Sequence, residues 1–257
     1  MHSHRGFTLI ELITVMVLVA VLSVFSVQFV ASVLENYNRT VDRAKLIAHG
    51  RQAMERMTRQ LRAALPNSVR VTNGGSCVEF LPIAGGGNYI GELPDVDNGA
   101  GGVASIASGG YQVTFGTARY VYVGALSTAE VYSNSAVSVG VAGSEDHSDA
   151  TVSLSGTHQF LRNSISSRFY LTDNPAAFCL NAGDLRYFSG YSTPSATTGT
   201  PTGAGSLMAE TVGSDGVPFL VSAGTEDRNS VLSMRLTYSR GGETVALNQE
   251  VLIRNVP

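Results

Sequence analysis

One acidic residue begins an otherwise apolar segment near the start of the chain. Glu11 is followed by residues 12–34, a stretch of 23 residues without a charged side chain, a proline or a glycine. At about 1.5 Å per residue, a helix of this length crosses a bilayer core of about 30 Å. A carboxylate at the edge of such a segment costs roughly 2–3 kcal/mol in lipid unless a cation pairs with it. The chemistry that Glu11 offers is therefore charge pairing within a membrane.

The two cysteines, Cys77 and Cys179, are the next candidates. The chain has no C-x-x-C sequence, and two cysteines are too few for a zinc site of the multi-cysteine kind. Outside the cytoplasm the natural expectation is one disulfide, which would close a loop of about 100 residues. In the cytoplasm both would be buried thiols, so the compartment decides between the two.

Catalytic signatures are absent from the sequence. No G-x-S-x-G, P-loop or H-E-x-x-H pattern occurs. The five histidines are scattered along the chain: His2, His4, His49, His147 and His158. Nothing supports a hydrolytic triad, so we expect no catalytic residues, no enzyme activity and no cofactor.

One acidic segment has oxygen-bearing side chains at alternate positions, as calcium loops do. It is Asp95-Val96-Asp97-Asn98-Gly99, and the glutamate that such a loop requires further on is missing. We therefore expect an acidic turn and no metal site. The same expectation holds for Glu145, Asp146 and Asp149.

The charges divide unevenly along the chain. Residues 35–65 carry seven Lys/Arg and three Asp/Glu, whereas residues 66–257 carry nine Arg and sixteen Asp/Glu. A basic helix can contact nucleic acid or anionic lipid, but the acidic remainder argues against nucleic acid as a partner. The interpretation that we favour is a solvated face, or one that meets acidic neighbours in an assembly.

The residues around the start of the apolar segment resemble the class III signal of type IV prepilins and type II secretion pseudopilins. The motif is Arg5-Gly6-Phe7-Thr8-Leu9-Ile10-Glu11. It combines a basic residue, a glycine, a phenylalanine and a glutamate at fixed spacing before a membrane-length apolar run. An ordinary secretory signal has a shorter apolar region, and a simple signal anchor does not explain Glu11.

This resemblance implies how the N-terminus is processed. Prepilin peptidase would cut between Gly6 and Phe7, Phe7 would be N-methylated, and Glu11 would pair with the Phe7 amine of a neighbouring subunit. The implied partners are other pilin subunits, major and minor, prepilin peptidase, an inner-membrane assembly platform and membrane lipid. The protein would be single-pass in the inner membrane with a periplasmic head, and on a pilus at the cell surface after assembly. In that location Cys77 and Cys179 would form a disulfide.

Beyond the apolar span the pattern becomes amphipathic. Apolar residues at spacings of three, four or seven predict one helix face, made of Tyr37, Val41, Ala44, Ile47, Met54, Met57, Leu61 and Leu65. Gly50 could mark a bend, and Pro66 ends the helix. The expected division is a leader at 1–6, a transmembrane and assembly helix at 7–34, its amphipathic continuation at 35–65 and a β-rich head at 66–257.

After Pro66, short apolar runs separated by turn residues predict strands. They lie at 69–72, 77–83, 111–115, 119–123, 137–141, 151–154, 168–171, 178–180, 185–188 and 219–221. Residues 231–238 and 244–254 flank a glycine turn and predict a terminal hairpin. Residues 84–110 and 189–206 lack periodicity, and the second stretch is expected to be a flexible surface loop. A long helix followed by an antiparallel sheet is an α+β, pilin-like fold.

Further segments narrow the resemblance. Residues 51–57, 60–62, 64–71 and 77–83, with the ending Asn255-Val256-Pro257, resemble minor pilins of the mannose-sensitive haemagglutinin (MSHA) pilus. The apolar span also lacks the helix-breaking proline of many major pilins. The expectation is a minor pilin that primes assembly or lies near the filament tip. The alternatives are a pseudopilin of a type II secretion system and a membrane-anchored adhesin or binding protein.

Overall fold

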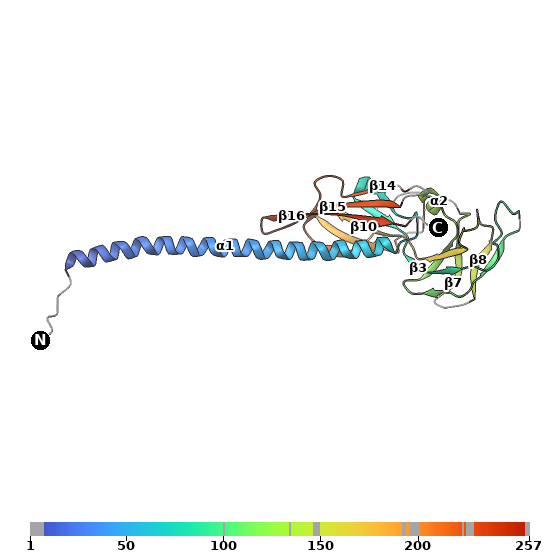
Figure 1. Ribbon diagram of the computed structural model, residues 1–257, viewed down its shortest axis with the longest axis horizontal. Coiled ribbons are helices and arrows are strands. Elements are labelled where there is room, and N and C mark those ends of the chain that lie inside the picture. Colours follow the sequence, from blue (N-terminus) through green and yellow to red (C-terminus); the bar gives the residue numbers. More distant parts are fainter. Residues whose placement is uncertain are drawn as a thin grey trace.

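The computed structural model describes residues 8–99, 101–133, 135–145, 150–191, 194–195, 201–222, 224 and 229–254. One long helix, α1 (Leu9–Arg62), precedes a β-rich head. Its 54 residues make it roughly 81 Å long. The first half of α1 extends free of the head, and the second half lies against it (Figure 1). The predicted α+β, pilin-like architecture is confirmed.

The helix ends at Arg62, slightly before the predicted end. Ala63 takes the C-cap position, and its N–H donates to the carbonyl of Arg59 at 3.2 Å. The N–H of Leu65 already donates to the carbonyl of Leu81 at 2.9 Å. Because a proline disfavours helical geometry in the residue before it, Pro66 favours this early exit.

The proximal lobe is the part of the head that packs on α1, and it contains two antiparallel sheets. The first sheet has the order β1 (Arg70–Thr72), β2 (Cys77–Phe80), β10 (Ala176–Asn181), β11 (Asp184–Ser189) and β12 (Ser206–Ala209), with the short helix η1 (Asn73–Gly75) between β1 and β2. In the second sheet β15 (Ser230–Arg240) pairs on one side with β13 (Val212–Gly213) and β14 (Phe219–Ser222), and on the other with β16 (Glu243–Ile253).

A single apolar core lies between α1 and these two sheets. The helix contributes Leu46, Ala53, Met54, Met57 and Leu61. The sheets contribute side chains such as Phe80, Phe178, Phe219, Leu232, Met234, Leu236, Val251 and Ile253. The predicted burial of Met54, Met57 and Leu61 is therefore confirmed, and these residues hold the helix to the head.

The distal lobe, residues 83–172, is inserted between β2 and β10. It forms a seven-stranded antiparallel sheet in the order β4-β8-β7-β6-β9-β3-β5. Its elements are β3 (Ile83–Asn88), β4 (Val103–Ala107), β5 (Gln112–Val113), β6 (Ala118–Tyr122), α2 (Thr128–Ser133), β7 (Ser138–Glu145), β8 (Thr151–His158) and β9 (Arg168–Thr172). The lobe has its own core around Ile106, Val121 and Phe169, and it lies past the C-terminal end of α1 (Figure 1).

A third apolar cluster joins the two lobes. Leu65 and Leu81 come from the segments that flank β1 and β2, and they pack with Tyr122, Val131 and Tyr132 of the distal lobe. The hydroxyl of Tyr132 also donates to the carbonyl of Ser68 at 2.7 Å. This packing fixes the distal lobe to the end of the proximal one.

Most of the predicted strands are present, and the terminal hairpin is confirmed. Its turn consists of Gly241 and Gly242, whose positive φ angles of 57° and 83° suit a two-residue turn. The predicted strand 77–83 instead divides at Pro82 into β2 and β3, which belong to different sheets. Residues 84–110, expected to lack regular structure, contain β4 and most of β3, and the elements β12, β13 and α2 were not predicted. The predicted loop 189–206 lies partly outside the described residues.

Candidate assembly site

The first turn of α1 orients Glu11. Thr8 is the N-cap, and its N–H and Oγ1 donate to Glu11 Oε2 at 3.1 and 3.0 Å, while the N–H of Glu11 donates to Thr8 Oγ1 at 3.4 Å. This capping box uses Glu11 Oε2, and no described residue donates to Oε1. One carboxylate oxygen is therefore positioned by the helix and the other is open to a further donor. The predicted cleavage and N-methylation residues, Gly6 and Phe7, lie outside the described residues.

The apolar segment of α1 makes no contact with the head. Residues 9–40 are all exposed, and the large apolar side chains among them are 48–77% exposed up to Leu34. Serine hydroxyls in this segment bond within the helix: those of Ser23 and Ser26 donate to the carbonyls of Ala20 and Leu22 at 2.8 Å. Within the described chain, α1 is the one helix long and apolar enough to cross a membrane. This segment is consistent with a membrane anchor.

The amphipathic half of α1 has two apolar faces rather than one. Leu46, Gly50 and the residues that follow at helical spacing face the proximal lobe. Tyr37 is 65% exposed and Ala44 is exposed, so their predicted place on the head-facing side is wrong. At about 100° per residue, Tyr37 and Ala44 lie on the opposite side of the helix from the buried stripe. The head first reaches α1 at Asp42, which pairs with Arg240 of β15 at 3.5 Å, and Leu46 is the first residue of the helix that it buries. Tyr37 precedes this contact, and Ala44 lies on the side of the helix that faces away from the head.

Gly50 is a contact point and not a bend. The helix continues through it without interruption, and the residue is buried. A Cβ at this position would lie 2.5 Å from Leu247 Cδ1 and 3.1 Å from the Tyr238 ring. Glycine therefore allows β15 and β16 to approach the helix backbone closely.

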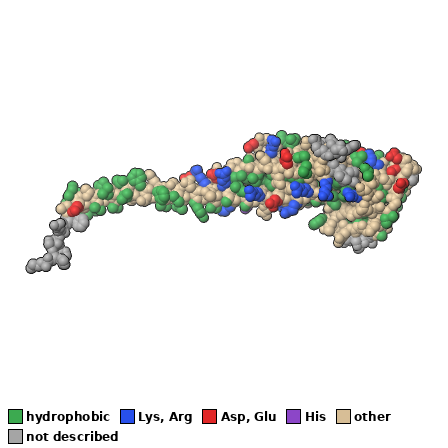
Figure 2. All heavy atoms as spheres, in the orientation of Figure 1, with side chains coloured by type: hydrophobic (Ala, Val, Ile, Leu, Met, Phe, Trp, Pro, Cys, Tyr) green, Lys and Arg blue, Asp and Glu red, His purple; other side chains and the backbone are tan. Residues whose placement is uncertain are grey.

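Cations cover the exposed side of the same helical half. Arg39 pairs with Glu35 at 2.7 Å, and the guanidinium of Arg56 lies 5.5 Å from the centre of the Tyr187 ring. Five further cations make no ion pair with a described residue: Arg43, Lys45, Arg51, Arg59 and Arg62. In Figure 2 the Lys and Arg side chains follow α1 from the end of its apolar half onto the head. The positive potential along this basic stripe attracts anionic groups.

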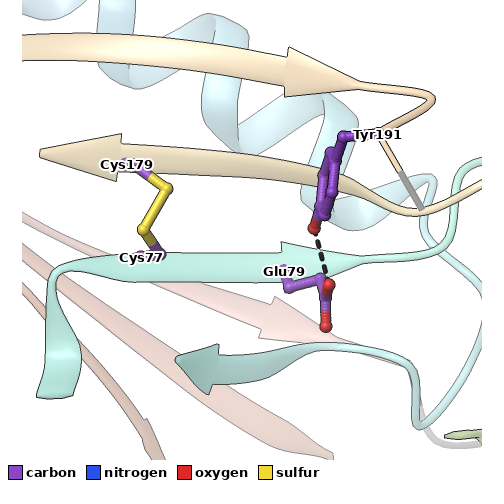
Figure 3. Close-up of a disulfide and its surroundings, with 4 residues drawn as sticks. All are labelled: Cys77, Glu79, Cys179 and Tyr191. Atoms are coloured by element: carbon purple, nitrogen blue, oxygen red, sulfur yellow. Dashed lines mark hydrogen bonds between the residues drawn. A yellow bond between two sulfur atoms is a disulfide. The ribbon is translucent and has the colours of Figure 1, made fainter. Parts of the chain in front are cut away.

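The two cysteines are bonded to each other, on the pair of strands from which the distal lobe extends. Cys77 on β2 lies directly opposite Cys179 on β10, and the disulfide joins residues 102 positions apart (Figure 3). The same pair of strands leads into the distal lobe from Phe80 and returns at Ala176. The bridge therefore closes a loop that contains the whole distal lobe.

A buried charged cluster lies on the same sheet. Glu79 is 3% exposed and accepts hydrogen bonds from the guanidinium of Arg70 and, at 2.5 Å, from the hydroxyl of Tyr191 (Figure 3). Arg70 also stacks 3.6 Å from the centre of the Tyr132 ring. Burial, and then the bond to Glu79, raises the pKa of Tyr191, so its hydroxyl remains a donor at neutral pH. The cluster fastens the segment after β11 to the first sheet.

This cluster was missed from the sequence, although a signal existed. Arg70 and Glu79 occupy directly opposed positions of β1 and β2. The two strands were predicted, but their register was not. Pairing them across the intervening glycines would have placed the two charges together.

The predicted acidic turn is confirmed at residues 95–99. Asp95 Oδ1 accepts from the N–H groups of Asp97 and Asn98 at 3.1 and 2.8 Å. These bonds, with one from Asn163, lower the pKa of Asp95 and keep it ionised. Of the other candidates, His49 is exposed and His158 is half-buried. Asp146, His147 and Asp149, the leader histidines and the side chain of Glu145 lie outside the described part of the chain.

Comparison with known proteins bears on the N-terminus. A family model described as the prokaryotic N-terminal methylation motif matches residues 1–27. Neither a search of curated proteins nor one of solved structures found a match. The motif implies assembly with other pilins and processing by the prepilin peptidase. Together, the matched motif, the apolar helix and the antiparallel head support a type IV pilin-like or pseudopilin-like protein.

Proposed function

We propose that this chain is a minor pilin, similar to minor pilin O of the MSHA pilus, and that it occupies the tip of its filament. The observation that carries the proposal is the position of the distal lobe. This lobe continues the long axis of the molecule past the end of α1 (Figure 1). In a filament whose helices pack side by side and whose subunits are added at the membrane, the distal lobe fills the space above the proximal lobe, where a subunit added earlier would otherwise sit. A subunit of this shape therefore suits the first position of a filament, at its tip.

The surfaces of α1 support a role in assembly. Its first half is apolar and exposed, with Glu11 held at the start and one carboxylate oxygen open. In lipid that oxygen favours a cation, which the N-methylated amine of a neighbouring Phe7 would supply after cleavage behind Gly6. The exposed stripe with Tyr37 and Ala44 continues the contact surface toward the head. Assembly of this kind requires no catalysis, and we assign the chain no enzyme activity.

The cysteine pair supports a head outside the cytoplasm. Disulfides persist in the periplasm and at the cell surface, whereas cytoplasmic thiols are kept reduced. The head would be periplasmic while α1 is in the inner membrane, and exposed on the pilus after assembly on the inner-membrane platform. A pseudopilin of a type II secretion system is the second candidate, and the N-terminal motif favours both equally.

The pairing role of Glu11 is tested by substitution in cells with a working prepilin peptidase. Glu11→Ala should leave membrane insertion and N-methylation of Phe7 intact but lower the amount in sheared filaments at least about tenfold, because an amine in lipid loses its partner. Glu35→Ala is the matched control, since Glu35 is an exposed helical carboxylate beyond the span, and it should change incorporation less than twofold. Mass spectrometry of the mature N-terminus and quantitative blotting of filaments are the measurements. Wild-type incorporation of Glu11→Ala would falsify the pairing role.

The tip position is tested by labelling. Gold-labelled antibody against the distal lobe should mark filament ends and leave the shaft unmarked. Labelling along the shaft at regular intervals would show that other subunits fit above the distal lobe, and would contradict the tip position.

A further inference from the structure

The last strand, β16, forms a free edge of the proximal lobe. It has 11 residues and pairs with β15 in regular register along its whole length. Within the described part of the chain, β15 is the one strand with which it pairs, and no other backbone group bonds to it. Every second residue of a paired strand directs its N–H and C=O away from the partner strand. The structure therefore leaves a row of backbone donors and acceptors on β16 without a partner.

Folded proteins usually protect such an edge. Common devices are a short strand, a bulge, a proline or a lysine. The other edge strands in the described part of the head are short, since β1, β4, β5, β12, β13 and β14 have two to five residues each. In contrast, β16 contains no bulge, proline or lysine, and its charged side chains are Glu243 and Glu250. An edge of this length and regularity suits the addition of another strand.

The side chains next to this edge are incompletely covered. Val245 and Leu247 pack against the core but remain half-buried, whereas Val251 and Ile253, further along β16, are fully buried. The strand runs alongside α1 (Figure 1), and a Cβ on Gly50 would lie 2.5 Å from Leu247 Cδ1. A strand added to β16 would cover the half-buried side chains and extend over the adjoining flank of the helix.

The adjoining flank of α1 carries Arg43, Ile47 and Arg51. At about 100° per residue, these lie roughly 20°, 60° and 100° around the helix from Gly50, which contacts β16. Arg56 lies roughly 120° around in the opposite direction and contacts β11 of the first sheet. The first sheet therefore covers one flank of α1, and the other flank lies beside the free edge of β16.

The three residues on this flank form a regular series. Arg43 and Arg51 are exposed and make no ion pair with a described residue, and Ile47 between them is half-buried. Along the helix axis the two arginines are separated by about 12 Å, with the isoleucine midway. In an extended strand, side chains four residues apart are separated by about 13 Å, with a third side chain midway on the same face. The series therefore matches a strand that presents an acidic, an apolar and a second acidic side chain on one face.

We propose that β16 binds an extended segment of another polypeptide, which adds to the second sheet as a new edge strand. The segment carries carboxylates opposite Arg43 and Arg51 and an apolar side chain opposite Ile47. A second copy of this chain fits less well, because the face of β16 that is turned to α1 offers one carboxylate, Glu243, for two arginines. A helical partner would cover the side chains but leave the backbone edge unpaired.

The test is hydrogen exchange measured by NMR on the full chain in detergent micelles, titrated with blocked nine-residue peptides. The acidic peptide has glutamate, valine and glutamate at alternate central positions and threonine elsewhere. In a second peptide lysine replaces both glutamates, and a third has the sequence of residues 243–253 and represents a second copy. We expect the acidic peptide to slow exchange at every second amide of β16 at least about tenfold, because an added strand bonds only the outward amides. The lysine peptide should bind at least about tenfold more weakly, and salt should weaken the acidic peptide.

Methylated peptides distinguish backbone pairing from contact by side chains alone. N-methylation of every second residue blocks the donors on one edge of a strand and leaves the side chains and the charge unchanged. Two such peptides, methylated on opposite edges of the acidic sequence, should differ in affinity at least about tenfold. Equal affinity of the two methylated peptides would show that the backbone edge of β16 is not used, and it would overturn the proposal.

Variants of the protein test the charged flank. Arg43→Gln with Arg51→Gln should lower the affinity for the acidic peptide at least about tenfold, since both cations that face it are removed. Lys45→Gln with Arg59→Gln is the matched control, because it removes two exposed cations from the rest of the same helical half, and it should change the affinity less than threefold. Equal losses in the two variants would show a general attraction to the basic helix and would contradict the proposal.

Each remaining outcome also decides against the proposal. Tighter binding of the 243–253 peptide than of the acidic peptide would identify a second copy as the occupant. Unchanged exchange of β16 at a saturating concentration of the acidic peptide would show that no strand is added there. None of these measurements depends on filament assembly, so this proposal and the proposed function fail separately.

Discussion

The two lobes of the head are built in opposite ways. The distal lobe is one continuous stretch of chain, residues 83–172, with its own core. The proximal lobe is assembled from α1 and from strands on both sides of that stretch, and β2 pairs with β10 across it. The first and last strands of the distal lobe, β3 and β9, pair with each other, so that Ile83 lies opposite Thr172. A lobe whose ends meet can be inserted into a sheet without separating the strands on either side.

This difference indicates separate tasks for the two lobes. The proximal lobe holds the head to α1 through Met54, Met57 and Leu61, and its form is constrained by the helix. The distal lobe touches the rest of the molecule at the junction cluster around Leu65 and Tyr132. It is therefore free to carry a surface unrelated to assembly. We therefore predict that a change within one lobe lowers the stability of that lobe and leaves the stability of the other unchanged.

Reduction of the Cys77–Cys179 disulfide should lower the free energy of unfolding more than any other change considered below. The size of the loss should show whether the two lobes unfold together. If both unfold together, the bridge closes a loop of about 100 residues and stabilises by about 5 kcal/mol in the chain-entropy model. If the distal lobe stays folded, Ile83 and Thr172 remain paired and the effective loop has about 13 residues, which lowers the stabilisation to about 3 kcal/mol. We expect the smaller value, with the loss confined to the proximal lobe.

Hydrogen exchange of oxidised and reduced protein at equal urea concentrations measures this difference, and no side chain needs to be changed. Protection in β1, β2 and β15 should fall, while protection in β6 and β9 should remain. A loss near 5 kcal/mol that is shared by all of these strands would show one cooperative unit, and the comparison between the lobes would then fail.

Gly50→Val should have the next largest effect, and again on one lobe. The new side chain would enter the space of Leu247 and Tyr238, and overpacking of this kind costs typically 1–3 kcal/mol. We expect about 2 kcal/mol from the proximal lobe, measured by urea unfolding with hydrogen exchange. Ala48→Val, on the exposed side of α1, is the control and should cost less than about 1 kcal/mol. Helix propensity alone favours valine over glycine, so a gain in stability, or no loss, in Gly50→Val would show that β15 and β16 do not require a glycine at this position.

Side-chain periodicity was sufficient to predict some elements of the fold and insufficient for others. The terminal hairpin follows from alternation around Gly241 and Gly242, and α1 from its apolar run. The strand β3 was invisible because Gly85, Gly86 and Gly87 have no side chains to alternate. Their absence has a steric reason, since a Cβ on Gly85 would lie 2.4 Å from the carbonyl oxygen of Gln112. The prediction that Tyr37 shares one apolar face with Met54 and Met57 was wrong, because a periodic pattern does not reveal where the head begins to cover α1.

The candidate site was predictable where it depends on local sequence. Glu11 stands out against an apolar run, and the acidic turn at Asp95 is formed by residues next to one another. The bond from Asn163 to Asp95 was not predictable, because the two residues are 68 positions apart and come together only after β3 and β9 pair. The same holds for the buried charged cluster of the first sheet, where the hydroxyl of Tyr191 donates to Glu79 from 112 residues further along the chain.

The smallest predicted effect concerns pH and the distal lobe alone. Burial lowers the pKa of His158, at the end of β8, below its ordinary value, against an opposing hydrogen bond to Ala136. The unfolded chain takes up the proton near pH 6.5 and the folded lobe resists it. Stability of the distal lobe should therefore be complete above about pH 6.5 and fall as the pH drops from there through the lowered pKa. The bond from Arg162 lowers the pKa of Glu130. The stability that this ion pair contributes is therefore lost only when the pH falls below the ordinary pKa of a glutamate, near 4.3. Between pH 7 and pH 5 the expected change in stability comes from His158.

Hydrogen exchange of β8 and β9 against β15 and β16, at pH 7 and pH 5 after correction for intrinsic rates, tests this. Protection of β8 and β9 should fall relative to β15 and β16, and His158→Gln should remove the difference because the variant has nothing to titrate in that interval. An equal fall in protection in both pairs of strands would mean that the two lobes unfold together. The junction cluster would then couple their stabilities, although the distal lobe is a continuous insertion. A fall that persists in His158→Gln would assign the titration to another group.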